Sequence, residues 1–241
     1  MALYRDTGVV LRTIRLGEAD RIVTLVTEGH GKVRAVAKGV RKTKSRFGAR
    51  LEPMAHVSLL LYQGRELDVV TQAEAIDHFR PVREDLDRLA RATAMLEVVD
   101  QVAQERQANV RLYQMLVGAL RALAAHDAPL LVPAFFWRLL SLEGFHPLLD
   151  QCALCGGADD LTAFGLLDGG GLCRACAPST ASRPVSAEAL DLLRAILDGS
   201  LREALHADAG PATAEVAALA TAAIEAHLER RLRSVGVLDR A

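Results

Sequence analysis

The sequence is poor in aromatic side chains, which make up 4% of its 241 residues. Hydrophobic residues make up 51%, but many of them are alanine. Because alanine favours helices and fills little volume, this composition argues against a large β-sandwich. Charged residues make up 24%, an ordinary value for a globular protein. We therefore expect an alanine-rich helical body and little low-complexity disorder.

The sequence also lacks the segments that direct a protein into or across a membrane. Its first thirteen residues carry Arg5, Asp6 and Arg12 and contain no apolar core of a secretory signal. The longest uncharged run that we find, residues 53–64, is far shorter than the ~20 residues that a spanning helix needs. We expect a cytoplasmic protein with no membrane partner, in a compartment where cysteine pairs bind metal more often than they form disulfides.

Several signatures of catalysis are missing as well. The stretch Gly29–Lys32 lacks the upstream glycine of a phosphate-binding P-loop, so no nucleotide site of that kind is expected. Neither a Gly-x-Ser-x-Gly nucleophile motif nor a His-Glu-x-x-His metal motif is present. No His-x-Glu accompanies a Pro-Cys-x-x-Cys, which disfavours a zinc deaminase. These absences predict that the protein is not an enzyme.

The net charge of −1 hides an uneven distribution of charge along the chain. Residues 1–80 contain 14 basic and 9 acidic side chains, whereas the remainder contains 15 and 21. From position 32 to position 50 no acidic residue occurs. The basic residues of this segment are Lys32, Arg34, Lys38, Arg41, Lys42, Lys44, Arg46 and Arg50. Such segregation indicates that one end of the protein meets a polyanion, and we predict that these eight side chains bind DNA.

The alternative interpretation of this basic segment is an ordinary solvated loop. It is weakened because the segment begins on a predicted strand, in which Val33, Ala35 and Ala37 face one way and basic side chains the other. Phe47, inside the basic segment, either stacks on a base or anchors the loop to the protein. Since few aromatic residues accompany it, contacts with the phosphate backbone should dominate, with weak sequence preference and a steep salt dependence.

The pattern of apolar residues divides the chain into a β part and a helical part. Five β-rich segments are predicted at residues 8–16, 21–27, 32–38, 55–62 and 66–75. Five short strands suit a small closed barrel, of which the OB-fold is the common form, although composition alone does not exclude an SH3-like barrel. After Pro81 the period becomes helical, with helices predicted near 86–107, 113–124, 130–142, 189–197 and 216–228. Trp137, in the most apolar helix, is predicted to pack in a core.

All four cysteines lie in two Cys-x-x-Cys pairs, Cys152/Cys155 and Cys173/Cys176, separated by seventeen residues. This spacing matches a zinc site built from two knuckles. Four thiolates complete a tetrahedron and leave no position open for water or substrate, so one structural Zn²⁺ is predicted. Two disulfides and a thioredoxin-like redox pair are the competing interpretations. The first is disfavoured by the missing secretory signal, and the second by the lack of a helix opening at either pair.

Taken in order, several stretches of the chain resemble the RecO family over essentially its whole length. They are residues 7–12 (TGVVLR), 16–25 (LGEADRIVTL), 31–42 (GKVRAVAKGVRK), 62–67 (YQGREL) and 142–149 (LEGFHPLL). The last runs directly into the first cysteine pair, and because all four cysteines are present the chain resembles the zinc-bearing members.

The resemblance implies an α+β protein: a five-stranded OB-fold barrel, then an α-helical domain with an inserted four-cysteine zinc finger. The expected division is 1–80 for the DNA-binding OB-fold, 81–149 and 183–241 for the helical domain, and 150–182 for the finger.

The resemblance also implies a nucleoid-associated recombination mediator in DNA repair. Such a protein binds single- and double-stranded DNA and anneals complementary strands. It contacts the C-terminal tail of single-strand-binding protein and, with RecR and RecF, helps to load RecA. Two alternatives remain at this point: an RNA-binding zinc-ribbon protein of translation or transcription, and a metalloenzyme, which a closed metal shell disfavours.

Overall fold

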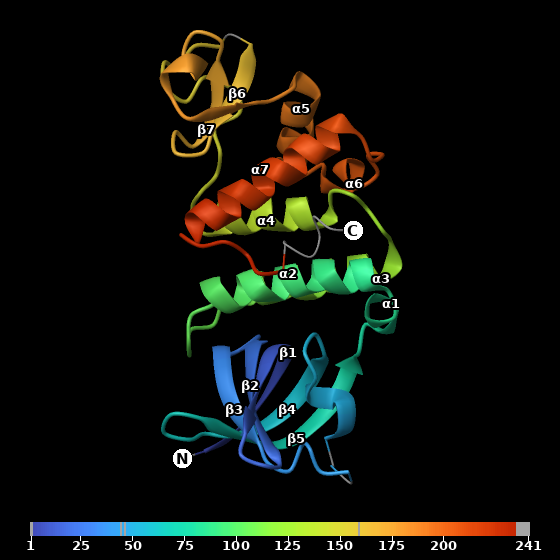
Figure 1. The fold of residues 1–241 in the computed structure, drawn as a ribbon. Coiled ribbons are helices and arrows are strands. Elements are labelled where there is room, and N and C mark those ends of the chain that lie inside the picture. The colour runs from blue at the N-terminus through green and yellow to red at the C-terminus, as the bar shows by residue number, and fades with distance from the viewer. Residues whose placement is uncertain (1, 44, 46, 159, 235–241) are drawn as a thin grey trace. The chain divides into compact units, whose positions relative to one another are not determined.

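The computed structural model describes residues 2–43, 45, 47–158 and 160–234 (Figure 1). The chain forms two compact units. The first unit contains the described residues up to 125 and residues 232–234, and the second contains residues 126–231. No helix in the described part of the chain combines the length and apolar character needed to cross a membrane.

The first unit begins with a closed barrel in the strand order β1-β2-β3-β5-β4. Its strands are β1 (Leu3–Leu16), β2 (Asp20–Thr27), β3 (Gly31–Ala37), β4 (His56–Tyr62) and β5 (Asp68–Asp77). The long strand β1 pairs with β4 through its first half and with β2 through its second half. A parallel pairing between β3 and β5 completes the barrel. The prediction of a five-stranded OB-type barrel is confirmed.

Burial along β3 follows the alternation that the sequence predicts. Val33, Ala35 and Ala37 are buried, and the residues between them are partly exposed. The long connection from β3 to β4 contains a short 3₁₀ helix, η1 (Gly48–Leu51). Phe47, just before η1, is 1% exposed and belongs to the barrel core. Phe47 therefore anchors the basic loop to the barrel, which was one of its two predicted roles.

Three helices complete the first unit: α1 (Arg80–Arg83), α2 (Leu86–Val102) and α3 (Val110–Ala125). The Asp85 side chain caps α2 by accepting from the backbone amides of Asp87 and Arg88. Helix α2 ends at Val102, earlier than the sequence predicts. The reason is that the loop after α2 pairs with the barrel: the Lys32 amide donates to the Gln104 carbonyl, and the Arg106 amide donates to the Lys32 carbonyl.

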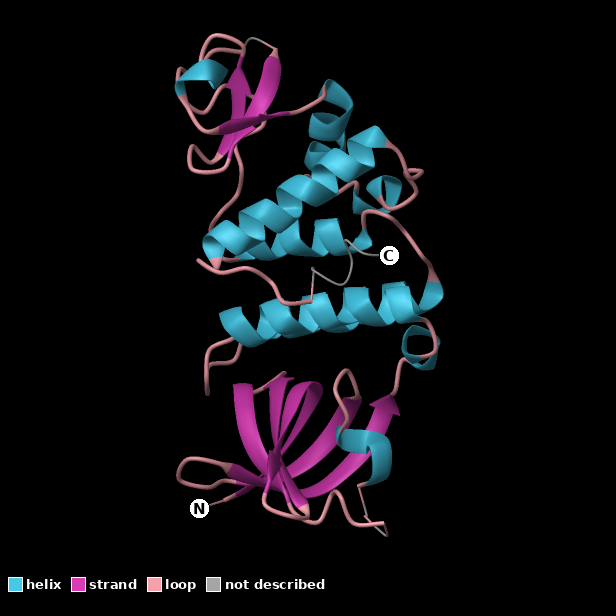
Figure 2. Ribbon diagram, viewed as in Figure 1, coloured by secondary structure: helices cyan, strands magenta, loops and turns pink. Residues whose placement is uncertain are grey.

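The second unit contains the remaining helices: α4 (Leu131–Leu142), α5 (Ala187–Leu197), α6 (Leu201–Ala204) and α7 (Pro211–His227). Helix α4 packs against α5 and α7, and Trp137 is buried, as predicted. Between α4 and α5 the chain forms a small antiparallel sheet, visible in Figure 2, in the order β7-β6-β8. Its strands are β6 (Leu161–Gly165), β7 (Gly170–Cys173) and β8 (Ser182–Pro184). The three predicted domain boundaries stay predictions. Contacts in the structure group α1–α3 with the barrel.

Candidate nucleic-acid interface and metal centre

One end of the barrel carries the basic loop, residues 38–50. The loop is held against the turn between β1 and β2, because the Arg41 amide donates to the Ala19 carbonyl (2.9 Å) and the Gly39 amide donates to Asp20 Oδ1 (2.7 Å). Gly39 has a positive φ of 66°, a conformation that glycine adopts without strain. The described part of the basic loop is therefore folded onto this end of the barrel.

The described cations of the basic loop differ in what they contact. Lys38, Lys42 and Arg50 are exposed. Arg41 is also exposed, but its guanidinium donates to the carbonyls of Gly17 (3.3 Å) and Glu18 (2.9 Å) and so fastens the loop. Two further predicted DNA-binding residues, Lys44 and Arg46, lie outside the described residues.

The two predicted DNA-binding residues on β3 lie on the outer surface of the barrel and are half-buried. Lys32 Nζ donates to the backbone carbonyl of Asp100 in the last turn of α2, at 2.7 Å. This position places a cation at the negative end of the helix dipole. Arg34 Nε is buried and has no hydrogen-bond partner in the part of the chain that the structure describes. The DNA-binding role of both residues remains a prediction.

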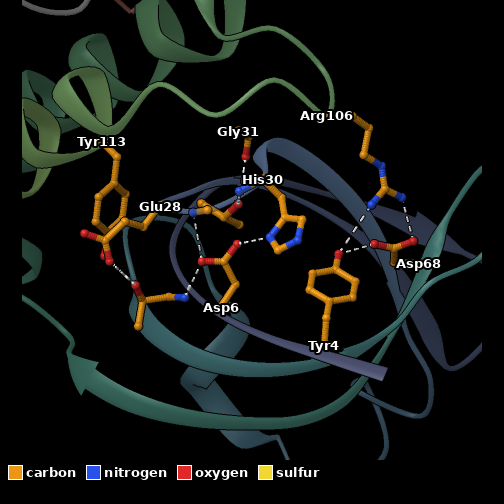
Figure 3. A network of polar contacts seen from close by, with 11 residues as sticks. Tyr4, Asp6, Glu28, His30, Gly31, Asp68, Arg106 and Tyr113 are labelled. Carbon is orange, nitrogen blue, oxygen red and sulfur yellow. Dashed lines mark hydrogen bonds and ion pairs between the residues drawn. The ribbon is translucent and has the colours of Figure 1, made fainter. Parts of the chain in front are cut away.

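The opposite end of the barrel is joined to the loop between α2 and α3 by a buried carboxylate (Figure 3). Asp68, at the start of β5, is fully buried and accepts hydrogen bonds from the Tyr4 hydroxyl, from Arg106 Nη2 (2.6 Å) and from the Gly64 amide (2.9 Å). Burial alone would raise the pKa of Asp68, but the hydrogen bonds from Arg106, Tyr4 and Gly64 outweigh it and lower the pKa. Asp68 is thus an ionised link between the barrel and the helices.

A second group of polar contacts lies beside this carboxylate in Figure 3. Asp6 accepts from the amides of Thr7 (2.8 Å) and Gly29 (3.1 Å), and its other oxygen lies 2.6 Å from His30 Nδ1. The Tyr113 hydroxyl, on α3, lies 3.2 Å from Thr7 Oγ1. The loop between α2 and α3 lies so close to Gly31 that a Cβ on this residue would be 1.9 Å from the Gln107 carbonyl oxygen. This end of the barrel is covered by its own chain.

The four cysteines converge in the second unit, as their spacing predicts. The Sγ atoms of Cys152, Cys155, Cys173 and Cys176 all lie within 4.8 Å of one another. Each pair forms a turn: the Gly156 amide donates to the Cys152 carbonyl (2.8 Å), and the Cys176 amide donates to the Cys173 carbonyl (3.1 Å). Gly156 has a φ of 70°, a backbone conformation that glycine adopts without strain, and so permits this turn. The arrangement offers four sulfur donors to a metal ion and is a candidate structural metal site.

Electrostatics of the cysteine cluster suit a cation. Amides of Cys155, Cys173 and Leu154 donate to the Cys152 sulfur and lower the pKa of that thiol to about 6. Hydrogen bonds with the sulfurs of Cys173 and Cys155 raise the pKa of Cys176 to about 12. The second shift reflects the difficulty of ionising neighbouring thiols together, which a bound divalent cation removes.

Comparisons with known proteins show the family to which the chain belongs. Residues 1–79 match the family model "Recombination protein O N terminal", and residues 83–235 match "Recombination protein O C terminal". The chain belongs to the RecO family. It is 46% identical over 245 residues to the "DNA repair protein RecO" of Frankia casuarinae, with both chains covered over their full length.

Sequence reasoning missed the contacts that join the barrel to its helices. Asp68 and Arg106 are 38 positions apart and belong to different predicted elements, so no periodicity relates them. The one available signal was an acidic residue at the start of an apolar strand.

Proposed function

We propose that this chain is a non-enzymatic recombination mediator, which binds single- and double-stranded DNA mainly through the phosphate backbone and anneals complementary strands. The observation that supports this most is the cationic end of the barrel. Lys38 and Lys42 are exposed there, on a segment without acidic residues. An annealing protein has to neutralise two phosphate chains and leave the base edges free, and a surface rich in cations and poor in aromatics meets that need.

The proposed DNA contacts comprise the eight basic residues of positions 32–50. Lys38, Lys42 and Arg50 face solvent and bind phosphates directly, whereas Arg41 shapes the loop through Gly17 and Glu18. Apart from Lys32, the covered end of the barrel takes no part, because the α2–α3 loop lies over it. We therefore place DNA along the end of the barrel that carries the basic loop and along the outer surface of the barrel.

We also propose that one structural Zn²⁺ is held by Cys152, Cys155, Cys173 and Cys176. Four sulfurs within 4.8 Å of one another match a tetrahedral thiolate site, and four protein donors leave no position for substrate. The zinc supplies folding energy to residues 150–182 and no chemistry.

Membership of the RecO family supports the proposed partners. With RecR and RecF, the chain helps to load RecA onto DNA coated with single-strand-binding protein, and it contacts the C-terminal tail of that protein. These partners place it in the cytoplasm, at the nucleoid. The DNA-binding domain spans 1–80, and the finger interrupts a helical domain formed by 81–149 and 183–241.

The experiment measures annealing and DNA affinity of the double variant Lys38→Gln/Lys42→Gln over a series of salt concentrations. Loss of two phosphate contacts lowers the slope of log affinity against log salt by about two and weakens binding at least ~10-fold at low salt. The control, Arg138→Gln/Arg202→Gln, removes two exposed cations from the second unit. Wild-type affinity and slope in the Lys38/Lys42 variant would contradict the proposal.

A further inference from the structure

A row of apolar side chains crosses the outer surface of the barrel. Ile14 on β1 pairs with Ile22 on β2, which pairs with Val36 on β3, and Val36 pairs with Val69 on β5. The residues that follow Ile22, Val36 and Val69 along their strands belong to the barrel core, so the side chains of the row point outward. Ile14 is 47% exposed, and the other three are partly exposed. These four side chains are named the apolar row.

The apolar row lies toward the end of the barrel that carries the basic loop. Val36 is two positions before Lys38, and Ile14 is two positions before Leu16, which is 39% exposed. Residues 14–22 and 36–52, which form this end, contain eight basic and three acidic side chains, a net charge of +5. The row has no aromatic ring on which a base could stack. A continuous exposed apolar surface marks a contact with another protein, and the charge around it favours a partner that is apolar and negative.

The finger of the same chain has these two properties. Residues 150–182 contain four acidic side chains and one basic side chain, a net charge of −3. In the turn between β6 and β7, Leu167 is 92% exposed and is followed by Asp168. Leu148, which is 38% exposed, adjoins this turn, because its amide donates to the Gly169 carbonyl (2.9 Å). The β6–β7 turn therefore presents apolar side chains on a negatively charged module, which suits a cationic protein surface and not DNA.

We infer that the β6–β7 turn of one copy of this chain docks on the apolar row of a second copy. Leu148 and Leu167 pack against the row, and the negative finger faces the positive end of the barrel. Because the two surfaces differ, the contact is heterologous: each copy keeps one free finger and one free barrel, so copies join head to tail beyond a dimer. Few side chains take part, which makes the contact weak, transient and sensitive to salt.

The contact has a consequence for DNA binding. Lys38 and Lys42, the exposed cations of the proposed DNA site, belong to the same end of the barrel as the apolar row. DNA and the finger of another copy therefore compete for this end, a consequence that rests on the proposed function. Copies that are free of DNA associate with one another, and DNA separates them.

Sedimentation velocity of the full chain, purified with zinc, measures the contact at increasing micromolar concentration. At low salt the weight-average mass should rise past twice the monomer mass of 26.0 kDa, and at high salt it should return to that mass because the charges are screened. A short single-stranded thymidine oligonucleotide should likewise separate the copies. A wild-type protein that stays at monomer mass at every concentration would overturn the inference. That result would leave the DNA titration of Lys38→Gln/Lys42→Gln unaffected, so the proposed function could stand without this contact.

Two double variants each remove one side of the contact. Leu167→Ser/Asp168→Asn changes the turn, and Ile14→Thr/Val36→Thr makes the row polar while keeping β-branched side chains. Each variant alone should stay at monomer mass. An equimolar mixture retains one intact contact and should form a dimer that cannot grow further. Association of either variant alone to the wild-type extent, or a mixture that stays at monomer mass, would overturn the inference.

A matched control uses the other exposed Leu-Asp pair of the chain, at the start of α2. Leu86 is 84% exposed, and Asp87 follows it. Leu86→Ser/Asp87→Asn makes the same chemical change away from both surfaces and should associate like the wild type. Thermal unfolding of all three variants establishes that each one is folded. A control that lost association as completely as the turn variant would also overturn the inference.

Discussion

The barrel and the cysteine-bearing finger achieve order in different ways. The barrel encloses a core cluster of fourteen described residues, including Phe47 and Leu61. The corresponding cluster of the finger has four described members, and two of them are the cysteines Cys152 and Cys173. Apolar burial stabilises in proportion to the area removed from water, so the barrel is stabilised by its own core, whereas we expect the finger to need a bound metal.

The largest expected effect follows from removing the metal. A chelator, or Cys173→Ser, should abolish hydrogen-exchange protection in residues 150–182 and leave β1–β5 protected, because the freed thiols lose the bonds that organise the finger. Hydrogen exchange read by mass spectrometry measures both regions at once. Leu167→Ser, at a position 92% exposed, serves as the control and should retain protection. If residues 150–182 stayed protected from exchange without metal, the finger would not differ from the barrel in how it is stabilised.

The next effect concerns the link between the barrel and its helices. Arg106→Ala leaves the buried Asp68 carboxylate without its cation and should lower the free energy of unfolding of the first unit by about 3 kcal/mol. Urea unfolding measures the change. Arg65→Ala removes an exposed arginine of the same barrel and should change the unfolding free energy by less than about 0.5 kcal/mol. Equal effects in the two variants would show that the Asp68–Arg106 pair contributes nothing specific.

The same pair predicts how stability depends on pH. The pKa of Asp68 is lower in the folded protein than its ordinary value near 3.8, so its ionised form stabilises the fold above that value. The contribution is lost as pH falls through the lowered pKa. The difference between the unfolding free energies of the wild type and Asp68→Asn should therefore be largest at neutral pH, begin to shrink as pH falls below about 4, and vanish only below the lowered pKa. A constant difference across this range would contradict an ionised, stabilising Asp68.

The smallest effect compares two glycines with positive φ, Gly17 in the barrel (55°) and Gly156 in the finger (70°). Neither has an atom within 4 Å of an added Cβ, so alanine introduces backbone strain alone, of about 1 kcal/mol in each case. Gly17→Ala should lower the urea midpoint of the barrel. Gly156→Ala should speed the loss of zinc to a chelator and leave that midpoint unchanged. A lower urea midpoint of the barrel in Gly156→Ala, or faster zinc loss in Gly17→Ala, would show that the two regions do not fold separately.

Sequence reasoning succeeded where one local pattern decides the structure. Strict alternation in β3 predicted its buried face, and the spacing of the cysteines predicted their convergence. It failed where contacts between segments distant in the sequence determine the structure. The end of α2 at Val102 depends on backbone bonds to Lys32, and the three-stranded sheet of the finger is built from strands of three to five residues, too short to show a period.

The same limit applies to the candidate interface. Charge along the sequence identified the basic segment, but only the strand register reveals that Ile14, Ile22 and Val36 form one row beside it. Likewise, only the fold shows that Lys32 reaches the carbonyl end of α2 while Lys38 and Lys42 remain open to solvent. Composition thus predicts that a polyanion binds, and only the fold shows which of the predicted cations are exposed.

The most direct test of the central claim, that the barrel recognises phosphates and not bases, uses two single-stranded oligonucleotides of one sequence. One has the natural phosphodiester backbone and the other an uncharged methylphosphonate backbone. Anisotropy titrations at low salt should show tight binding of the first and at least ~100-fold weaker binding of the second, since the interaction is mainly electrostatic. Comparable affinity for the two backbones would contradict the account.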